Sequence, residues 1–426
     1  MRYLPQTKNS RTEMLRVVGA KSVDDLFKDI PAKAFIKGKA NLPDHKGELE
    51  VERILGGYAN QNHAAPQGPF FLGAGTYYHH IPATVDHIIQ RSEFLTAYTP
   101  YQPEIAQGTL QAIYEFQSFI ALLTGQDIAN ASMYDGATAC AEGALMAQRV
   151  TKRRKIALGT TLHPDYRAVL ETYMGNFADV EIVDGNPDSE CACVIIQSPD
   201  FHGTPHAYDK WRKICDETGA LLVVVINEIV SLGLLPPPSQ ADIVCGEAQS
   251  IGLPMSYGGP HLGFFACKEQ FLRQMPGRLC GMTEDAAGKR GFVLTLSTRE
   301  QHIRREKATS NICTNQGLCA LAFTVHMALL GENGIRRLAR LNHEAAGRLA
   351  DALSKVKGVK IINETFFNEF VIELPKDAKT VVEALAQKGI IAGYAMDKNR
   401  LLVAATEMTM DADIAALATA LGEVLK

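Results

Sequence analysis

Short runs of apolar residues alternate with longer stretches of helical period in the middle of the chain, and this alternation limits the possible folds more than any other feature. We expect strands at residues 155–158, 180–183, 193–196, 221–226 and 243–245. Short, mainly apolar strands separated by helices are typical of a parallel sheet with helices on both faces. We therefore predict a large α/β domain over residues 66–325, with an early helix from Glu104 to Leu123.

The pattern differs on either side of this domain. Residues 1–65 contain two short amphipathic segments, Thr12–Val18 and Ser22–Phe27, and are expected to form an arm that packs on another surface. Residues 326–426 alternate helices and short strands, which favours a small α+β domain with an antiparallel sheet. In this small domain we expect helices at 334–355, 380–388 and from residue 411, and strands at 359–362, 369–374, 390–394 and 400–404.

The composition excludes several classes of protein. With 426 residues, 46% of them hydrophobic, the chain can bury a large core. A net charge of −4, from 43 basic and 47 acidic residues, gives no positive excess for binding nucleic acid or an anionic membrane. Residues Met1–Asn9 lack the apolar core of a signal peptide, and the longest apolar run, Ala220–Ile226, is too short to span a bilayer. We therefore expect a soluble, cytoplasmic protein.

The nine cysteines do not indicate disulfides or metal ligands. Their number is odd, they form no Cys-x-x-Cys pair, and only Cys191 and Cys193 are close in sequence. No pair of histidines or cysteines has the spacing of a metal site. We expect reduced, buried thiols and no bound metal.

The segment Ala248–Pro260 has the sequence AQSIGLPMSYGGP. It resembles the loop that carries the cofactor lysine in fold-type-I pyridoxal-phosphate enzymes, where a small or hydroxyl residue and then a glycine-rich turn follow the lysine. Here the lysine position is Gln249, and a carboxamide nitrogen cannot form a Schiff base. The chain therefore resembles the scaffold of such an enzyme without its reactive amine, which indicates that it works with a partner.

Three further motifs narrow the resemblance. They are Tyr98–Gly108 (YTPYQPEIAQG), Met133–Ala139 (MYDGATA) and the long run Thr298–Thr314 (TREQHIRREKATSNICT). With them the chain resembles, over nearly its whole length, the alpha subunit (subunit 1) of the two-subunit glycine decarboxylases, the P-proteins of the glycine cleavage system. In the single-chain members of that family two homologous halves are fused, and only the second half carries the cofactor lysine. Gln249 fits the first half.

The resemblance implies a fold-type-I transferase-like large domain and a role as an obligate enzyme subunit. Together with a homologous lysine-bearing beta subunit, as an α₂β₂ heterotetramer, the chain would decarboxylate glycine and pass the aminomethyl group to the lipoyl arm of the H-protein. The partner would bind the pyridoxal phosphate, and this chain would bind none covalently and would be inactive alone. Two alternatives are a stand-alone pyridoxal-phosphate enzyme that uses another lysine and a non-catalytic scaffold. Gln249 argues against the first, and the full-length resemblance argues against the second.

Other positions also indicate a degenerate cofactor site. Fold-type-I enzymes place an Asp after a buried strand to keep the pyridine nitrogen protonated, whereas Asn227 and Glu228 follow the strand at 221–226 here. Asn227 cannot supply that negative charge. His163 and His202 also follow strands, where an imidazole ring either stacks on a cofactor or is an ordinary loop histidine.

A helix is expected to open directly after Asp135. Backbone donors at its N-terminus could hold a phosphate, although close packing explains a start of small residues equally well. The residues of this start are Gly136, Ala137 and Thr138.

Hydrogen-bonding aromatic residues gather in two loops before the predicted sheet, around Tyr77–His80 and Tyr98–Gln102. By resemblance, such loops reach toward the active site of the lysine-bearing partner; the alternative is a loop core or a subunit interface. The candidates for residues that reach the partner's active site are Tyr98, Thr99, Tyr101, Gln102 and Glu104. Glu104 is equally explained as an acidic residue at a helix N-terminus. The basic run from Arg299 to Lys307 is expected to be a solvated, salt-bridged surface or a subunit contact.

Overall fold

The computed structural model describes residues 6–36, 38, 40–96, 98–175 and 179–426. The chain divides into two compact units, residues 1–63 and residues 64–426. The first unit contains α1 (Lys8–Val18), η1 (Asp24–Phe27), η2 (Ala32–Ala34) and α2 (Glu48–Ala59). Thr7 caps α1 by accepting the N–H of Ser10. The helices α1 and α2, both described in full, bury none of their side chains, so they contribute to no core within this unit.

A seven-stranded sheet forms the centre of the second unit, in the order β1-β7-β6-β5-β4-β2-β3. Its strands are β1 (Ile128–Ala129), β2 (Lys155–Leu158), β3 (Ile182–Asp184), β4 (Cys191–Gln197), β5 (Leu221–Ile226), β6 (Ile243–Glu247) and β7 (Gly263–Cys267). The five strands from β3 to β6 are parallel, whereas β7 and β1 are antiparallel to their neighbours. The predicted α/β class and parallel-rich sheet are confirmed.

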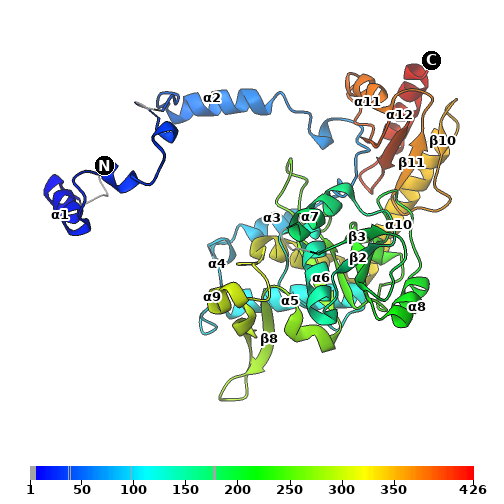
Figure 1. Ribbon diagram of the computed structural model, residues 1–426. Coiled ribbons are helices and arrows are strands. Elements are labelled where there is room, and N and C mark those ends of the chain that lie inside the picture. Colours follow the sequence, from blue (N-terminus) through cyan, green and yellow to red (C-terminus); the bar gives the residue numbers. More distant parts are fainter. Residues whose placement is uncertain (1–5, 37, 39, 97, 176–178) are drawn as a thin grey trace. The chain divides into compact units, whose positions relative to one another are not determined.

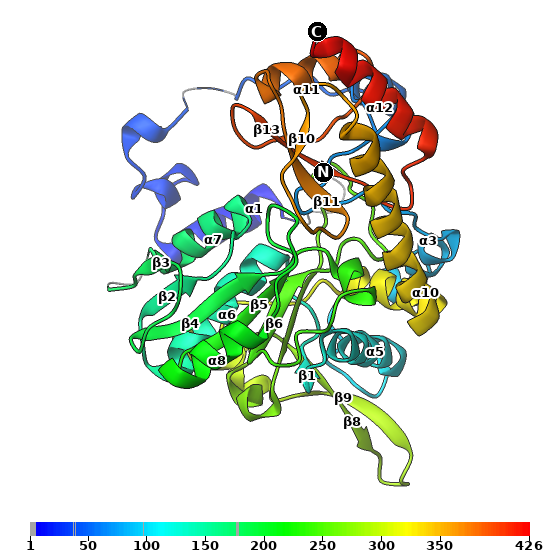
Figure 2. The ribbon, with the colours of Figure 1, turned by 90° about the vertical axis from the view of Figure 1, so that its right-hand side faces the viewer.

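Alternate side chains of the parallel strands enter two cores, one on each face of the sheet. Ile156 and Val223 pack on one face with α6 (Gly136–Thr151) and α7 (Pro164–Met174). Ala157 and Val224 pack on the other face, and the helices there are α5 (Gln107–Thr124), α8 (Asp209–Thr218) and the first part of α10. Figure 2 shows α6 and α8 with the parallel strands. Burial on both faces is the reason why these strands appear as continuous apolar runs in the sequence.

Helix α10 (Gly317–Leu353) consists of two helices that meet at a kink, and the second of them corresponds to the predicted helix at 334–355. It has a break at Gly331, whose φ of 58° is left-handed, and this glycine-containing break resembles a helix start in the sequence. Within the described residues, α10 is the one helix long and apolar enough by length and composition to cross a membrane. Half of its most apolar window is buried in the core, as in a core helix of a soluble protein.

The C-terminal region forms a four-stranded antiparallel sheet in the order β10-β11-β13-β12 (Figure 2). Its elements are β10 (Lys360–Ile361), β11 (Glu369–Glu373), α11 (Ala378–Ala386), β12 (Tyr394–Ala395), β13 (Arg400–Ala404) and α12 (Asp411–Val424). The sheet shares a core with α11, α12 and the second part of α10. Phe71 belongs to the same core, and its carbonyl accepts the N–H of Ala404 at 2.9 Å. This contact fixes the start of the following segment, residues 72–80, which leads into the candidate site.

The hairpin of β8 (Leu279–Glu284) and β9 (Arg290–Thr295) extends from the body (Figure 1). The predicted start of α5 at Glu104 is wrong: residues 103–105 form a turn, in which Ala106 donates to Pro103 O, and the helix begins at Gln107. The remaining elements are η3 (Ala65–Gln67), α3 (Ala83–Ile89), α4 (Ser92–Leu95), η4 (Ile229–Gly233), η5 (Glu269–Gln274), η6 (Ser297–Arg299), α9 (Gln301–Arg304) and η7 (Arg305–Lys307). All nine cysteines are free, and Cys313 alone among them is exposed.

Candidate functional site

The predicted cofactor positions converge at the carboxyl ends of the parallel strands, where ligands bind in folds of this type. His163 lies after β2, Asn227 directly after β5 and Gln249 two residues after β6. The residues Gly136, Ala137 and Thr138 form the first turn of α6, as predicted.

Gln249 is buried, with 2% of its surface exposed. Its side-chain Nε2 donates to Leu253 O at 2.6 Å, and its backbone N–H donates to Glu247 Oε1 at 3.0 Å. The carboxamide is therefore used as a donor within its own loop. No amine is present at this position to bond covalently to a cofactor.

The first turn of α6 is occupied by the chain itself. Asp135 caps the helix by accepting the N–H of Thr138 at 2.8 Å. The N–H of Gly136, the first residue of the helix, donates to Glu247 Oε2 at 3.0 Å. A side chain at Gly136 would collide with the hydroxyl of Tyr166, so this turn is tightly packed as well as hydrogen-bonded.

Glu247 is the centre of this arrangement. Its Oε1 accepts the backbone N–H groups of Gln249 at 3.0 Å and Leu262 at 2.7 Å, while Oε2 accepts the N–H of Gly136. His261 Nδ1 lies 3.7 Å from Oε2. Burial raises the pKa of Glu247, whereas His261 and the three backbone donors oppose that rise. A carboxylate thus lies where a phosphate group would contact the helix, and the two do not fit together.

The position that the pyridine ring of the cofactor would take is also occupied. The carbonyl of Ala74 lies 2.9 Å from His163 Nε2, and a Cβ atom at Gly75 would be 2.8 Å from Asn227 Nδ2 and 3.1 Å from His163 Nε2. Asn227 Oδ1 is buried without a hydrogen-bond partner. Because backbone packs against both His163 and Asn227, a pyridine ring does not fit between them. The residues present therefore do not fit pyridoxal phosphate.

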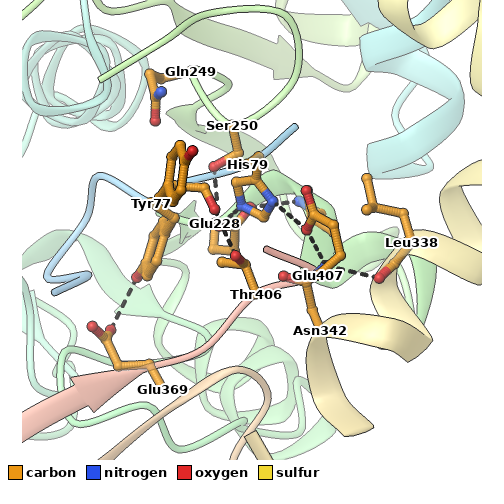
Figure 3. Close-up of polar contacts among 12 residues, drawn as sticks. Tyr77, His79, Glu228, Gln249, Ser250, Leu338, Asn342, Glu369, Thr406 and Glu407 are labelled. Atoms are coloured by element: carbon orange, nitrogen blue, oxygen red, sulfur yellow. Dashed lines mark hydrogen bonds and ion pairs between the residues drawn. The ribbon is translucent and has the colours of Figure 1, made fainter. Parts of the chain in front are cut away.

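Glu228 does not serve as a charge partner for a pyridine nitrogen, because both of its carboxylate oxygens contact other groups. Its Oε1 accepts the N–H of Val230 at 2.9 Å, and its Oε2 lies 3.0 Å from Ser250 Oγ and 3.2 Å from His79 Nε2. Figure 3 shows His79 between Glu228 and Glu407. This carboxylate therefore belongs to a buried polar network and does not replace the missing aspartate.

His79 lies between Glu228, which follows β5, and Glu407, which follows β13. Its Nδ1 lies 2.9 Å from Glu407 Oε2, and Glu407 Oε1 accepts the N–H of His80 at 2.7 Å. Burial lowers the pKa of His79, but the carboxylates of Glu407 and Glu228 outweigh this and raise its pKa to about 10. The pKa of Glu407 is raised by burial but lowered more by His79, to about 2. The three side chains therefore form an ionic triad, in which His79 and Glu228 are buried and Glu407 is partly buried.

A second buried carboxylate, Glu369, fixes the middle of the segment that packs on Asn227. Its Oε1 accepts the N–H of Ala74 at 2.6 Å, and its Oε2 accepts the hydroxyl of Tyr77 at 3.0 Å (Figure 3). Burial raises the pKa of Glu369 to about 7. Sequence reasoning missed Glu247, Glu369 and Glu407. The available signal was an acidic residue within or next to an otherwise apolar strand.

The residues predicted to reach the partner's active site lie in another part of the second unit. Tyr98 and Tyr101 are 80% and 60% exposed, and Gln102 and Glu104 are exposed as well. Thr99 differs, because its hydroxyl is buried without a hydrogen-bond partner. Two aromatic hydroxyl groups are thus presented to solvent by a loop with two prolines.

Tyr101 lies beside the long motif at 298–314. Its ring centroid is 6.1 Å from that of His302 and 5.7 Å from the guanidinium of Arg278. Arg278 is buried, donates to Thr314 Oγ1 at 3.3 Å, and lies 3.6 Å from Glu300 Oε2. The aromatic loop and the long motif therefore form one surface with a buried cation beneath it.

The interpretation of the basic run as a solvated surface is wrong at its first residue. Arg299 is buried, and its guanidinium donates to the backbone carbonyls of Met275 and Gly277 instead of facing solvent. The exposed residues of the run are His302, Ile303, Arg304, Arg305, Glu306 and Lys307. Within the described part of the chain, no group of three His, Cys, Asp or Glu residues could hold a metal ion.

Comparisons with known proteins identify the family to which the chain is similar. A family model described as "Glycine cleavage system P-protein" matches residues 1–421. A protein of Parvibaculum lavamentivorans named "Probable glycine dehydrogenase (decarboxylating) subunit 1" is 56% identical, with full coverage of both chains. A crystal structure of glycine decarboxylase (P-protein) of the glycine cleavage system, in inhibitor-bound form, is 44% identical with a TM-score of 0.88, again with full coverage of both.

A more distant structure shares the fold. It is a mutant of a cystine C–S lyase with glycine covalently linked to its PLP cofactor. It is 14% identical with a TM-score of 0.60, over 90% of this chain and 100% of that chain. The chain therefore shares the fold of this PLP-dependent enzyme.

Proposed function

The chain belongs to the glycine cleavage system P-protein family as a subunit of the enzyme, and we propose that a homologous, lysine-bearing partner subunit holds the pyridoxal phosphate. The main support for this proposal is that the chain's own groups fill its cofactor site. Gln249 replaces the amine, the Glu247 carboxylate contacts the helix N-terminus, and the Gly75 backbone packs on Asn227. Pyridoxal phosphate is needed for the family's chemistry, so another chain must provide it.

The partner's cofactor would supply an electron sink for the loss of carbon dioxide from glycine. The aminomethyl group would then pass to the lipoyl arm of the H-protein. This chain would contribute surface and positioning, in an α₂β₂ assembly in the cytoplasm. Tyr98, Thr99, Tyr101, Gln102 and Glu104 remain the candidates for residues that reach the partner's site.

Exposed apolar side chains support a partner surface around the aromatic loop. Large apolar residues that are at least half exposed gather there: Leu95, Tyr98, Tyr101, Ile105 and Ile303. Considered by itself, the first unit also has exposed apolar side chains, including Val17 of α1 and Leu49 of α2. Stable interfaces bury more than about 1,000 Å², and apolar and aromatic residues are common at their centres.

Mixing this chain with its lysine-bearing partner at micromolar concentration should give one stable complex by light scattering. Borohydride reduction of that complex with pyridoxal phosphate should label the partner alone, because Gln249 offers no amine. The control is the isolated chain, which should remain unlabelled at any specific lysine. Separate elution of the two chains would contradict the subunit assignment, and a specific adduct on this chain would contradict the placement of the cofactor.

Tyr101→Phe and Gln102→Ala should each lower glycine turnover by the complex roughly tenfold, because positioning groups of this kind contribute that much to rate. Assembly and the partner's cofactor spectrum should not change, since both residues are exposed and little packing is lost. Turnover is measured as exchange of labelled bicarbonate into glycine with the H-protein present. Tyr394→Phe, at an exposed tyrosine of the C-terminal sheet, is a matched control. Loss of assembly in step with rate would instead make the loop a purely structural interface.

A further inference from the structure

We propose that Glu247 is a built-in anion that closes the phosphate position of this fold, and that its removal would open a site for a free phosphate-class anion. The proposal concerns this chain alone and does not depend on a partner. It rests on the acceptor geometry of one buried carboxylate and on the helix that it contacts.

The Glu247 carboxylate accepts three backbone N–H groups from three separate segments. These come from Gly136 at the start of α6, from Gln249 after β6, and from Leu262 before β7, at 3.0, 3.0 and 2.7 Å. The backbone donors converge on two oxygens that are shielded from solvent. Convergent backbone donors at a helix N-terminus are what binds phosphates in many proteins.

The negative charge of the Glu247 carboxylate would oppose the entry of another anion. α6 has 16 residues, and the positive end of its dipole favours a negative charge near Gly136. With the carboxylate in place that charge is already present, and a phosphate dianion would meet a like charge in a poorly hydrated site. The donors are also already satisfied, so a second anion would gain few hydrogen bonds.

Among the described residues, no basic side chain lies within hydrogen-bonding distance of the Glu247 carboxylate. His261 Nδ1 at 3.7 Å is the one basic side-chain nitrogen within 4 Å among the described residues, and that atom is itself buried without a hydrogen-bond partner. Removal of the carboxylate would therefore leave three backbone donors and one imidazole directed at an empty volume. An added anion would find convergent backbone donors at a helix N-terminus, an arrangement that binds phosphate in many proteins.

The test is thermal unfolding of the full-length Glu247→Ala chain with increasing inorganic phosphate, and with formate as a smaller anion. Without added anion, the variant should unfold roughly 5 °C or more below the wild type, because three buried donors lose their acceptor. Phosphate should then raise the Tm of the variant in a saturable way, by at least about 2 °C more than that of the wild type. Equal shifts in the two chains would overturn the proposal.

The matched control is Glu369→Ala, which removes another buried carboxylate. Glu369 accepts one backbone N–H and one hydroxyl, and it lies at no helix N-terminus, so phosphate should not restore its stability. A phosphate response of the same size in this control would overturn the proposal. Should Glu247→Ala not fold, Glu247→Gln keeps the volume but turns an NH₂ group toward backbone donors. That variant should be less stable than the wild type and insensitive to phosphate, and wild-type stability would overturn the proposal.

Discussion

The Gln249→Lys chain, purified without its partner, should release carbon dioxide from glycine at least about 10²–10³-fold more slowly than the assembled enzyme. A new amine at 249 restores one requirement of the chemistry and leaves two others unmet. Asn227 gives the pyridine nitrogen no negative charge, and the Glu247 carboxylate keeps its three backbone donors. Electrostatic stabilisation of developing charge commonly accounts for several kcal/mol of the barrier, so the loss of the charge partner alone makes the site slow.

The measurement is release of labelled carbon dioxide from glycine, with the assembled wild-type enzyme as reference. The Gln249→Lys/Asn227→Asp double variant is the informative control, since it restores the amine and the charge while Glu247 and Gly75 stay in place. It should remain slow because the chain's own atoms still fill the site. A rate near that of the assembled enzyme in the single variant would show that the missing lysine was the only defect of the site. The same rate in the double variant alone would show that Glu247 and Gly75 do not block the site.

Regular elements with buried faces could be predicted from the sequence. β2 and β5 match the expected strands, because both of their faces are buried and every residue in them except Lys155 is apolar. The part of α10 after the kink at Gly331 was predicted, whereas the part before it was not. The absence of an amine at 249 could also be predicted, since one residue type decides it.

The contacts that fill the cofactor site could not be predicted. Glu247 and Glu369 lie more than a hundred residues from Gly136 and Ala74, the residues that they contact. An isolated acidic residue at a strand end gives no sign of its partner, because long-range pairing is decided by the packing of whole elements. The start of α5 is a local example: a turn at Pro103 replaced the first predicted helical residues, although Glu104 suits a helix N-terminus.

His79→Ala should lower the free energy of unfolding of this chain by about 3–5 kcal/mol, because it leaves two carboxylates buried without their cation. His79 lies 3.2 Å from Glu228 and 2.9 Å from Glu407 in the native protein. The neighbouring histidine gives a matched control. His80 is exposed and contacts Glu407 through its backbone N–H, which His80→Ala retains, so that variant should stay within about 0.5 kcal/mol of the wild type.

The pH dependence of this loss separates the ionic triad from simple packing. The pKa of His79 is raised by the two carboxylates from an ordinary value of 6.5 to about 10 in the folded chain. Its stabilisation is therefore fully present below pH 6.5 and is lost as the pH rises through 10. The pKa of Glu369, raised by burial to about 7, adds a separate decline that begins above its ordinary value of 4.5 and is nearly complete by about pH 8. Between pH 8 and 10, denaturant unfolding should show wild-type stability falling toward that of His79→Ala. A constant difference between the two chains across that interval would mean that His79 acts as a neutral packing residue.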